Sequence, residues 1–169
     1  MQTTRLLRLL LAGTAIAVTT GCDVPSDPTV PHGAQPLELH VLGEPTVNYI
    51  YFGLPDRRRV VIRTRDAWES FWNEATAGVT PGPPVPSVDF GSYMVIVAGA
   101  GTKPTSGYGV RVDAVHEREG RIYVQVREVS PGATCGTYQA FTSPTTAVRV
   151  PRRDGSAVFL ESAEVTTCD

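Results

Sequence analysis

The strongest constraint on the fold is the alternation of apolar and polar residues in the second half of the chain. In residues 108–113 and again in residues 122–127, every second residue is tyrosine, valine or isoleucine. Successive side chains of a strand point to opposite faces of a sheet, so this alternation predicts two strands that each bury one face. Residues 116–120, which end in Gly120, predict the turn of a hairpin between them.

Other apolar stretches extend the β pattern. Residues 93–98 are apolar at consecutive positions, which is typical of a central strand covered on both faces. Shorter stretches predict strands at residues 39–41, 47–51, 60–62, 147–150 and 157–160. The pair Asp154-Gly155 is a strong turn signal and predicts a last hairpin between the final two strands. We therefore expect about eight strands, mostly antiparallel.

One segment has the spacing of a helix. Trp68, Phe71, Trp72 and Ala75 recur at intervals of three and four residues, and Thr64 or Asp66 precedes them as a candidate N-cap. We interpret this aromatic face as core packed on a sheet, with a ligand-stacking platform as the alternative. The prediction is a mainly β, α+β fold. It is a single domain over residues 37–169, built either as an antiparallel β-sandwich or as a sheet covered by one helix.

The N-terminus predicts export. Arg5 and Arg8 precede an apolar stretch of residues 9–18, which is the pattern of a secretory signal. This stretch is too short for a spanning helix, which needs roughly 20 apolar residues. Small residues before Cys22 resemble a lipobox, although Thr19 stands where a larger aliphatic residue is usual. We predict a signal peptide over residues 1–21, a lipid on Cys22, and a membrane-anchored lipoprotein on the periplasmic or cell-surface side. An ordinary signal peptide is the alternative.

A proline-rich stretch over residues 22–36 predicts a tether between lipid and domain. With Cys22 acylated, Cys135 and Cys168 are the remaining cysteines, and two thiols in an oxidising compartment usually pair. We predict that disulfide; a catalytic Cys135 thiolate is the alternative. The net charge of −2 argues against nucleic acid as a partner, because phosphate binding needs a concentrated positive surface.

Motifs for catalysis are missing from the sequence. Neither Gly-x-Ser-x-Gly nor His-Glu-x-x-His occurs, and the three histidines, His32, His40 and His116, are far apart. We predict a binding module and no enzyme, with no catalytic residue, metal or cofactor; a metal site from His40, His116 and a carboxylate is the alternative. Residues 57–59, three consecutive arginines, predict a solvated hairpin end or, as the alternative, a contact with anionic head groups.

Residues 64–151 resemble the C-terminal domain of the PrcB family, lipoprotein subunits of bacterial surface protease complexes. The matching pieces occur in the family's order: Trp68 to Trp72 on a helix, Val88-Asp-Phe90, Lys103-Pro-Thr-Ser-Gly-Tyr108, Val129-Ser-Pro131 and Gln139-Ala-Phe-Thr-Ser-Pro144. The family commonly has a second glycine at the position of Ser106 and an aromatic residue at that of Thr145. The resemblance implies that this chain is a non-catalytic accessory subunit that binds a protein. In the named family that protein is an extracytoplasmic protease.

The same loop is also similar to a loop of chagasin-type cysteine-protease inhibitors, which gives an inhibitor as the alternative function. The arginine-proline-aromatic loop of those inhibitors is missing, since Val150-Pro151-Arg152 has only the proline. We predict that the partner binds a loop that Pro104 and Gly107 turn sharply, beside residues 139–145. Its residues are Lys103, Pro104, Thr105, Ser106, Gly107 and Tyr108. The alternative is that this loop is only a well-made turn.

Overall fold

A computed structural model describes residues 29–42, 50–51 and 53–168. The predicted signal peptide, the lipidated Cys22 and most of the predicted strand at residues 47–51 lie outside the described residues. In the described part, no helix has both the length and the apolar character needed to cross a membrane.

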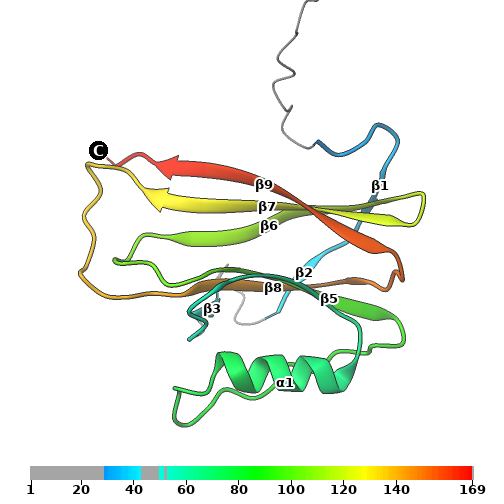
Figure 1. Cartoon of the computed structure of the whole chain (residues 1–169), viewed down its shortest axis with the longest axis horizontal. Helices are drawn as coiled ribbons and strands as arrows, with labels where there is room; N and C mark the ends of the chain where they lie inside the picture. Colours follow the sequence, from blue (N-terminus) through cyan, green and yellow to red (C-terminus); the bar gives the residue numbers. More distant parts are fainter. Residues whose placement is uncertain (1–28, 43–49, 52, 169) are drawn as a thin grey trace, which may run out of the picture.

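The described chain forms three layers, with one sheet packed on a second sheet and a single helix on the far face of the second (Figure 1). Its elements in chain order are β1 (Gln35–Leu37), β2 (His40–Val41), β3 (Ile50–Tyr51), β4 (Arg57–Ile62), α1 (Arg65–Ala75), β5 (Tyr93–Ala100), β6 (Gly109–Arg118), β7 (Arg121–Pro131), β8 (Pro144–Pro151) and β9 (Ser156–Thr166). This architecture confirms the predicted mainly β, α+β class with one helix. Both packing arrangements that we considered are present, a β-sandwich and a sheet covered by a helix.

The strands are divided between two sheets. The first has the order β1-β6-β7-β9, and the second has the order β2-β8-β5-β4, with β3 also paired to β8. All pairs are antiparallel except β7 and β9, which run parallel over eleven residue pairs. The central strand β5 is flanked by β4 and β8, as its apolar sequence predicts.

Two hydrophobic cores follow from the layers. Between the sheets lie the inward side chains of β5, β6, β7 and β8, among them Ile96, Val124 and Val148, which are fully buried. Between the second sheet and α1 lie the opposite side chains of β5 together with Trp68, Phe71 and Trp72. Because β5 has a core on each side, its residues alternate between the two cores.

The helix begins and packs as predicted. Thr64 is the N-cap, and its hydroxyl accepts a hydrogen bond from the backbone N–H of Ala67. The indole N–H of Trp68 donates to the carbonyl of Pro86 at 2.9 Å, and that of Trp72 donates to the carbonyl of Pro83 at 2.9 Å. These bonds hold the proline-rich connection to β5 against the helix. The aromatic face is therefore core, as we interpreted it.

The hairpin predicted around Gly120 is confirmed. The strands β6 and β7 pair up to Arg118 and Arg121, so the turn consists of Glu119 and Gly120. Both turn residues have positive φ, 50° and 72°. A two-residue turn with two positive φ angles matches the twist of the strands that it joins.

The predicted last hairpin is wrong, because β8 and β9 belong to different sheets. Strand β8 already pairs with β5 on one edge and with β2 and β3 on the other, so β9 has no free edge there. The chain instead crosses at residues 152–155 to the free edge of β7, where Ala157 and Phe159 cover the core between the sheets. The Asp154-Gly155 turn signal is local and does not specify which sheet the next strand joins.

The start of the described chain also differs from expectation. Gln35 and Pro36, which we predicted as part of the tether, are the first residues of β1 and pair with Glu117 and His116 of β6. The guanidinium of Arg118 donates to the carbonyl of His32 just before this strand. The described N-terminal residues therefore lie beside the β6–β7 turn.

Candidate partner-binding site

The structure brings the two predicted partner-binding segments together at one end of the sandwich. Residues 103–108 lie in the connection between β5 and β6, and residues 132–143 connect β7 to β8. Lys103 donates from its backbone N–H to the carbonyl of Thr142 at 2.7 Å, and Thr142 donates back to the carbonyl of Lys103 at 3.1 Å. We call these two segments the 103–108 loop and the 132–143 segment, and together the loop end.

A second set of hydrogen bonds joins the two segments further out. The backbone N–H of Ser106 donates to the carbonyl of Tyr138 at 3.0 Å, and the N–H of Tyr138 donates to the Ser106 hydroxyl at 2.9 Å. The hydroxyl of Thr142 donates to the carbonyl of Thr105 at 3.1 Å. Ser106 thus uses the side chain that distinguishes it from the commoner glycine to fix the neighbouring segment.

Gly107 makes the sharp turn that the sequence predicts. Its φ is +90°, and a Cβ atom there would lie 3.1 Å from the Cβ of Pro131 and 3.5 Å from the Cγ2 of Thr137. A residue with a side chain would be strained in this conformation and crowded as well. Beside this turn is a shallow pocket of about 190 Å³, lined by residues 107–111 and by Val129.

Three side chains of the 103–108 loop already have partners within the domain. Lys103 is only 25 % exposed; its ammonium lies 3.7 Å from Glu128 Oε2 and 5.7 Å from the centre of the Tyr108 ring. The Thr105 hydroxyl donates to the carbonyl of Ser106 at 3.1 Å, and Ser106 bonds Tyr138. All three side chains are therefore only partly exposed, because the neighbouring strands and segment supply partners. Pro104 and Gly107 are exposed.

The exposed apolar groups of the loop end lie on the 132–143 segment. Tyr138 is 81 % exposed and Phe141 is 83 % exposed, the two highest values among the large hydrophobic residues of the described chain. Phe141 lies in the stretch that sequence analysis placed beside the loop, but Tyr138 was missed. The signal that could have found Tyr138 is an aromatic residue within a stretch of small and polar residues that has no β alternation.

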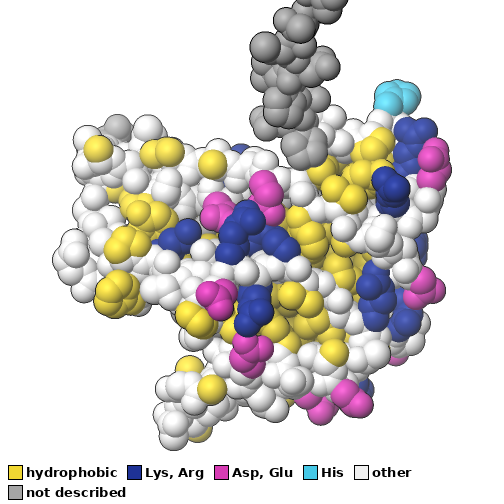
Figure 2. Space-filling view, in the orientation of Figure 1, with side chains coloured by type: hydrophobic (Ala, Val, Ile, Leu, Met, Phe, Trp, Pro, Cys, Tyr) yellow, Lys and Arg dark blue, Asp and Glu magenta, His cyan; other side chains and the backbone are white. Residues whose placement is uncertain are grey.

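The loop end has almost no charge. Its 132–143 segment contains no acidic or basic residue, and its 103–108 loop contains only Lys103. Figure 2 shows uncharged and hydrophobic side chains at the left, where the loop end lies, and charged groups in the middle and at the right. Depletion of charge together with exposed aromatic side chains is typical of the centre of a protein–protein interface.

The three arginines at residues 57–59 are not a solvated hairpin end, because they form strand β4 and are all paired. Arg59 lies 2.7 Å from both Glu128 and Glu161, while Arg58 reaches Glu74 of α1 at 2.8 Å. Arg57 also contacts Glu128 and Glu161, both at 2.7 Å. These pairs join the edge of one sheet to the edge of the other. The contact with anionic head groups stays a prediction. Charged side chains gather in the middle of the view in Figure 2.

Burial and ion pairing act against each other on Glu128. Burial raises the pKa of its carboxyl group, and the hydrogen bonds and charges of Arg57 and Arg59 lower it by more, so the pKa lies below its ordinary value of 4.5. The same contacts raise the pKa of Arg57. Glu128 is therefore ionised near neutral pH, and its pairs with Arg57 and Arg59 stabilise the contact between the two sheets.

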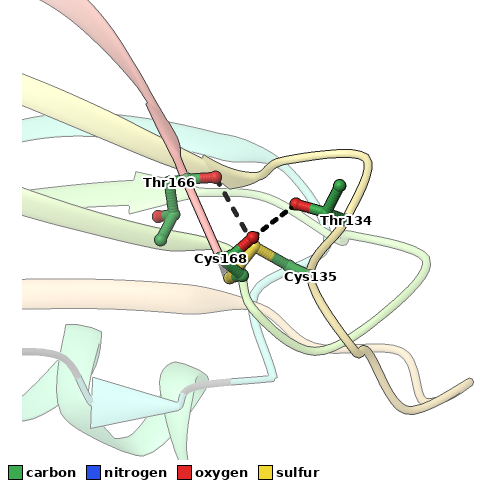
Figure 3. The surroundings of a disulfide bond; sticks show 4 residues. All are labelled: Thr134, Cys135, Thr166 and Cys168. Carbon is green, nitrogen blue, oxygen red and sulfur yellow. Dashed lines mark hydrogen bonds between the residues drawn. A yellow bond between two sulfur atoms is a disulfide. The ribbon is translucent and has the colours of Figure 1, made fainter.

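The predicted disulfide is present between Cys135 and Cys168, whose Cα atoms are 5.0 Å apart (Figure 3). The Thr134 hydroxyl donates to the carbonyl of Cys168 at 2.7 Å, and the Cys135 sulfur lies 3.5 Å from the carbonyl of Thr166. The bond fastens the 132–143 segment to the tail that follows β9. A paired Cys135 cannot act as the thiolate nucleophile of our alternative.

The histidines do not meet in a pocket. His40 lies 3.2 Å from Glu38, but both side chains are largely exposed on the edge near β2. His116 is on β6, in the other sheet. Among the residues that the structure describes, no group of three histidine, cysteine or acidic side chains is arranged to hold a metal ion.

Comparison with known proteins gives one match. Residues 94–151 match the family model described as PrcB C-terminal, which confirms the resemblance over that range. No curated protein and no solved structure matches the chain. The matched range holds β5 to β8 and both segments of the loop end, but not α1, β9 or Cys168. It is shorter than the range 64–151 over which we noted the resemblance.

Proposed function

We propose that this chain is an exported lipoprotein whose β-rich domain binds an extracytoplasmic protease as a non-catalytic accessory subunit. The observation that carries the proposal is the loop end, with Tyr138 and Phe141 more than four-fifths exposed on a charge-free segment. The family match over residues 94–151 supports an accessory role related to protease complexes. In this proposal the docking surface is the loop end, and Tyr138 and Phe141 are its anchors.

The fixed backbone of the loop end favours binding over a merely structural turn. Four backbone N–H groups and three side-chain hydroxyls tie the two segments together or cap them locally, so the loop end is ordered before a partner arrives. Preorganisation lowers the entropy that binding must remove. The two exposed aromatic rings, by contrast, have no packing role in the free domain and are available to a partner.

The direction of the chain suits a tethered binding module. Strand β6 starts directly after the 103–108 loop and ends beside the described N-terminal residues, which pair with its last residues. Ten residues of strand span roughly 30 Å. The loop end therefore lies at the opposite end of the sandwich from the point where the tether joins, and it would face away from a lipid on Cys22.

The inhibitor alternative has less support from this arrangement. An inhibitor of the chagasin type inserts several loops into one active site, and the two candidate segments here are the 103–108 loop and residues 150–152. These segments lie at opposite ends of the sandwich, because β8 runs from the loop end toward residue 151. They cannot enter one cleft together, so inhibition would depend on the 103–108 loop alone.

A site-specific crosslink tests the proposal. A photoreactive phenylalanine analogue replaces Phe141 in the full chain, and cells are irradiated before the membrane fraction is solubilised. The matched control places the same analogue at Glu119, whose side chain is 79 % exposed at the opposite end. We expect a protease in the adduct from position 141 and none from position 119. Equal adducts from both positions, or an adduct without a protease, would refute the proposal.

Two further measurements test the helper role and the lipid anchor separately. Removal of this chain should lower the activity of the crosslinked protease if the chain is a helper, whereas an increase would establish the inhibitor alternative. Mass spectrometry of the membrane-purified chain tests the anchor, since the proposal requires an N-terminus at an acylated Cys22. A first residue other than Cys22 contradicts the lipid anchor and leaves the docking surface to be judged by the crosslink.

A further inference from the structure

We infer that the disulfide between Cys135 and Cys168 controls the docking surface, so that its reduction by a dithiol switches partner binding off. This inference rests on the function proposed above. It makes the bond a device that shapes the binding site, beyond a staple for the tail. The argument follows from what holds the 132–143 segment in place.

No residue of the 132–143 segment is buried, and none belongs to either hydrophobic core. Its two large apolar side chains, Tyr138 and Phe141, are the most exposed in the described chain. Hydrophobic burial, which orders the strands, therefore contributes almost nothing to ordering this segment. Its conformation depends on hydrogen bonds near the surface and on one covalent bond.

These attachments fall into two groups along the segment, one toward each of its ends. On one side, Tyr138 and Thr142 are bonded to the 103–108 loop. On the other side, Gly132 donates to the carbonyl of Thr166 at 2.9 Å, and Cys135 is linked to Cys168. Residues 136 and 137 link the two groups, and Phe141 lies between the two residues that are bonded to the 103–108 loop.

The attachment of the segment at Gly132 and Cys135 depends on the disulfide. Cys168 lies two residues beyond the end of β9, in a tail that no strand pairing holds. Among the described residues, a hydrogen bond from Thr134 to the carbonyl of Cys168 also joins this tail to the segment. Exposed hydrogen bonds compete with water, and the entropy of freeing several residues opposes them. Once the S–S bond is broken, the tail and residues 133–137 separate, and the bonds at Ser106 become the outer end of a frayed loop.

The bond is accessible to exchange. Both cysteines are partly exposed, and Ala133, Thr134 and Thr167 around them are exposed. A thiolate of an external dithiol attacks one sulfur, forms a mixed disulfide, and releases the other sulfur as a thiolate. The second thiol of the reductant then resolves the mixed disulfide. Two electrons and two protons pass from the dithiol to Cys135 and Cys168, and the reductant leaves as its own disulfide.

Hydrogen exchange tests whether the bond orders the surface. The comparison uses the oxidised full chain and the Cys135→Ser/Cys168→Ser variant, with Val124→Ala as the matched control that lowers stability from within the core. We expect the amides of Ser106, Tyr138 and Thr142 to exchange at least about tenfold faster in the double variant and to approach the rates of unstructured peptide. The amides of β5 should stay protected in all three proteins. Protection of the three loop amides in the double variant would overturn the inference.

Crosslinking then tests control of binding. The analogue at position 141 is compared in oxidised protein, in protein reduced by a dithiol after folding, and in the Val124→Ala background. We expect the adduct yield to fall at least about tenfold on reduction and to persist with Val124→Ala. Unchanged yield after reduction overturns the inference while the proposed function stands. Failure of the oxidised protein to form any adduct overturns the proposed function and the switch with it, and hydrogen exchange still decides whether the bond orders the segment.

Discussion

The two ends of the sandwich are built in opposite ways. At the end opposite the loop end, which we call the charged end, arginines bind backbone carbonyls. Arg63 donates to the carbonyls of Arg153 and Gly155 at 2.8 and 2.6 Å. Arg152 donates to the carbonyls of Arg63 and Phe90 at 3.0 and 2.8 Å. At the loop end, the longer 132–143 segment carries no charge and presents two aromatic rings. At the charged end the arginines are bonded within the domain, whereas at the loop end two aromatic side chains stay exposed to solvent.

This difference separates the parts of the sequence that serve the fold from those available for binding. Guanidinium groups that bind carbonyls fix the crossing from β8 to β9, so they serve contacts within the domain. The loop end is ordered by backbone bonds and one disulfide, so Tyr138 and Phe141 can change without disturbing a core. The following variants measure that division, from the largest expected change in stability to the smallest.

Loss of the disulfide should have the largest effect. The Cys135→Ser/Cys168→Ser variant should lower the free energy of unfolding by about 3–4 kcal/mol, since the bond closes a loop with a sequence separation of 33 residues. Urea denaturation of the oxidised wild type and the variant measures the difference. A loss below about 1 kcal/mol would mean that the loop end is held by its hydrogen bonds alone.

Arg152→Ala should come next. Removal of the guanidinium leaves the carbonyls of Arg63 and Phe90 without this donor, and we expect a loss of about 2 kcal/mol. Thermal or urea unfolding measures it. The matched control at the same end is Arg65→Ala, whose guanidinium lies 3.9 Å from Glu69 in an exposed pair and should contribute less than about 0.5 kcal/mol. Equal losses from both variants would show that the carbonyl contacts do not distinguish this end.

Glu128 should give a smaller effect that depends on pH. The folded protein holds its pKa below the ordinary value of 4.5, so its contribution is fully present above that pH and is lost as the pH falls through the lower folded value. The free energy of unfolding of the wild type should exceed that of Glu128→Gln by about 1 kcal/mol at pH 7. This difference should shrink below pH 4.5. Unfolding free energies of both proteins across this range test the sign. A difference that grows on acidification would contradict the ion-pair cluster as its cause.

Tyr138→Ala and Phe141→Ala should change stability least. Both side chains are exposed, so each variant should unfold within about 0.5 kcal/mol of the wild type. In the proposed docking surface, each should weaken binding to the crosslinked protease at least about tenfold, as measured by titration with the purified partner. Val165→Ala, at a residue that is 64 % exposed on β9, is the control for loss of an exposed apolar group elsewhere. A stability loss above 1 kcal/mol would place these rings in the scaffold.

Sequence analysis predicted the local elements well and their long-range partners less well. Thr64 and the face from Trp68 to Ala75 have a helical spacing that no other local structure explains, and the alternation around Gly120 is equally specific. The pairing of β9 could not be predicted, because it depends on which strand edge is still free after β8 is covered. Periodicity says which face of a strand is buried, but it does not say which neighbour the strand has.

The candidate site was predicted in part for the same reason. The 103–108 loop and residues 139–145 were expected side by side from their order in a known family, and the disulfide was expected from counting cysteines. The direction of Lys103 was missed, since Glu128 lies 25 residues away in sequence and reaches it only through the pairing of β6 with β7. Tyr138 was missed because the resemblance pointed to residues 139–144, and this aromatic residue lies just before that stretch.

The parallel pairing of β9 with β7 also has a consequence for the order of events after synthesis. Until residues 156–166 have emerged and paired, β7 is an edge strand beside a core that lacks Phe159 and Ala157. Such an intermediate exposes Val124 and Val126 to neighbouring chains. Aggregation should therefore be easiest in the interval before β9 pairs with β7. Cys168 reaches Cys135 only when β9 is in place. During oxidative refolding, an alkylating reagent would therefore label the chains in which β9 has not yet paired.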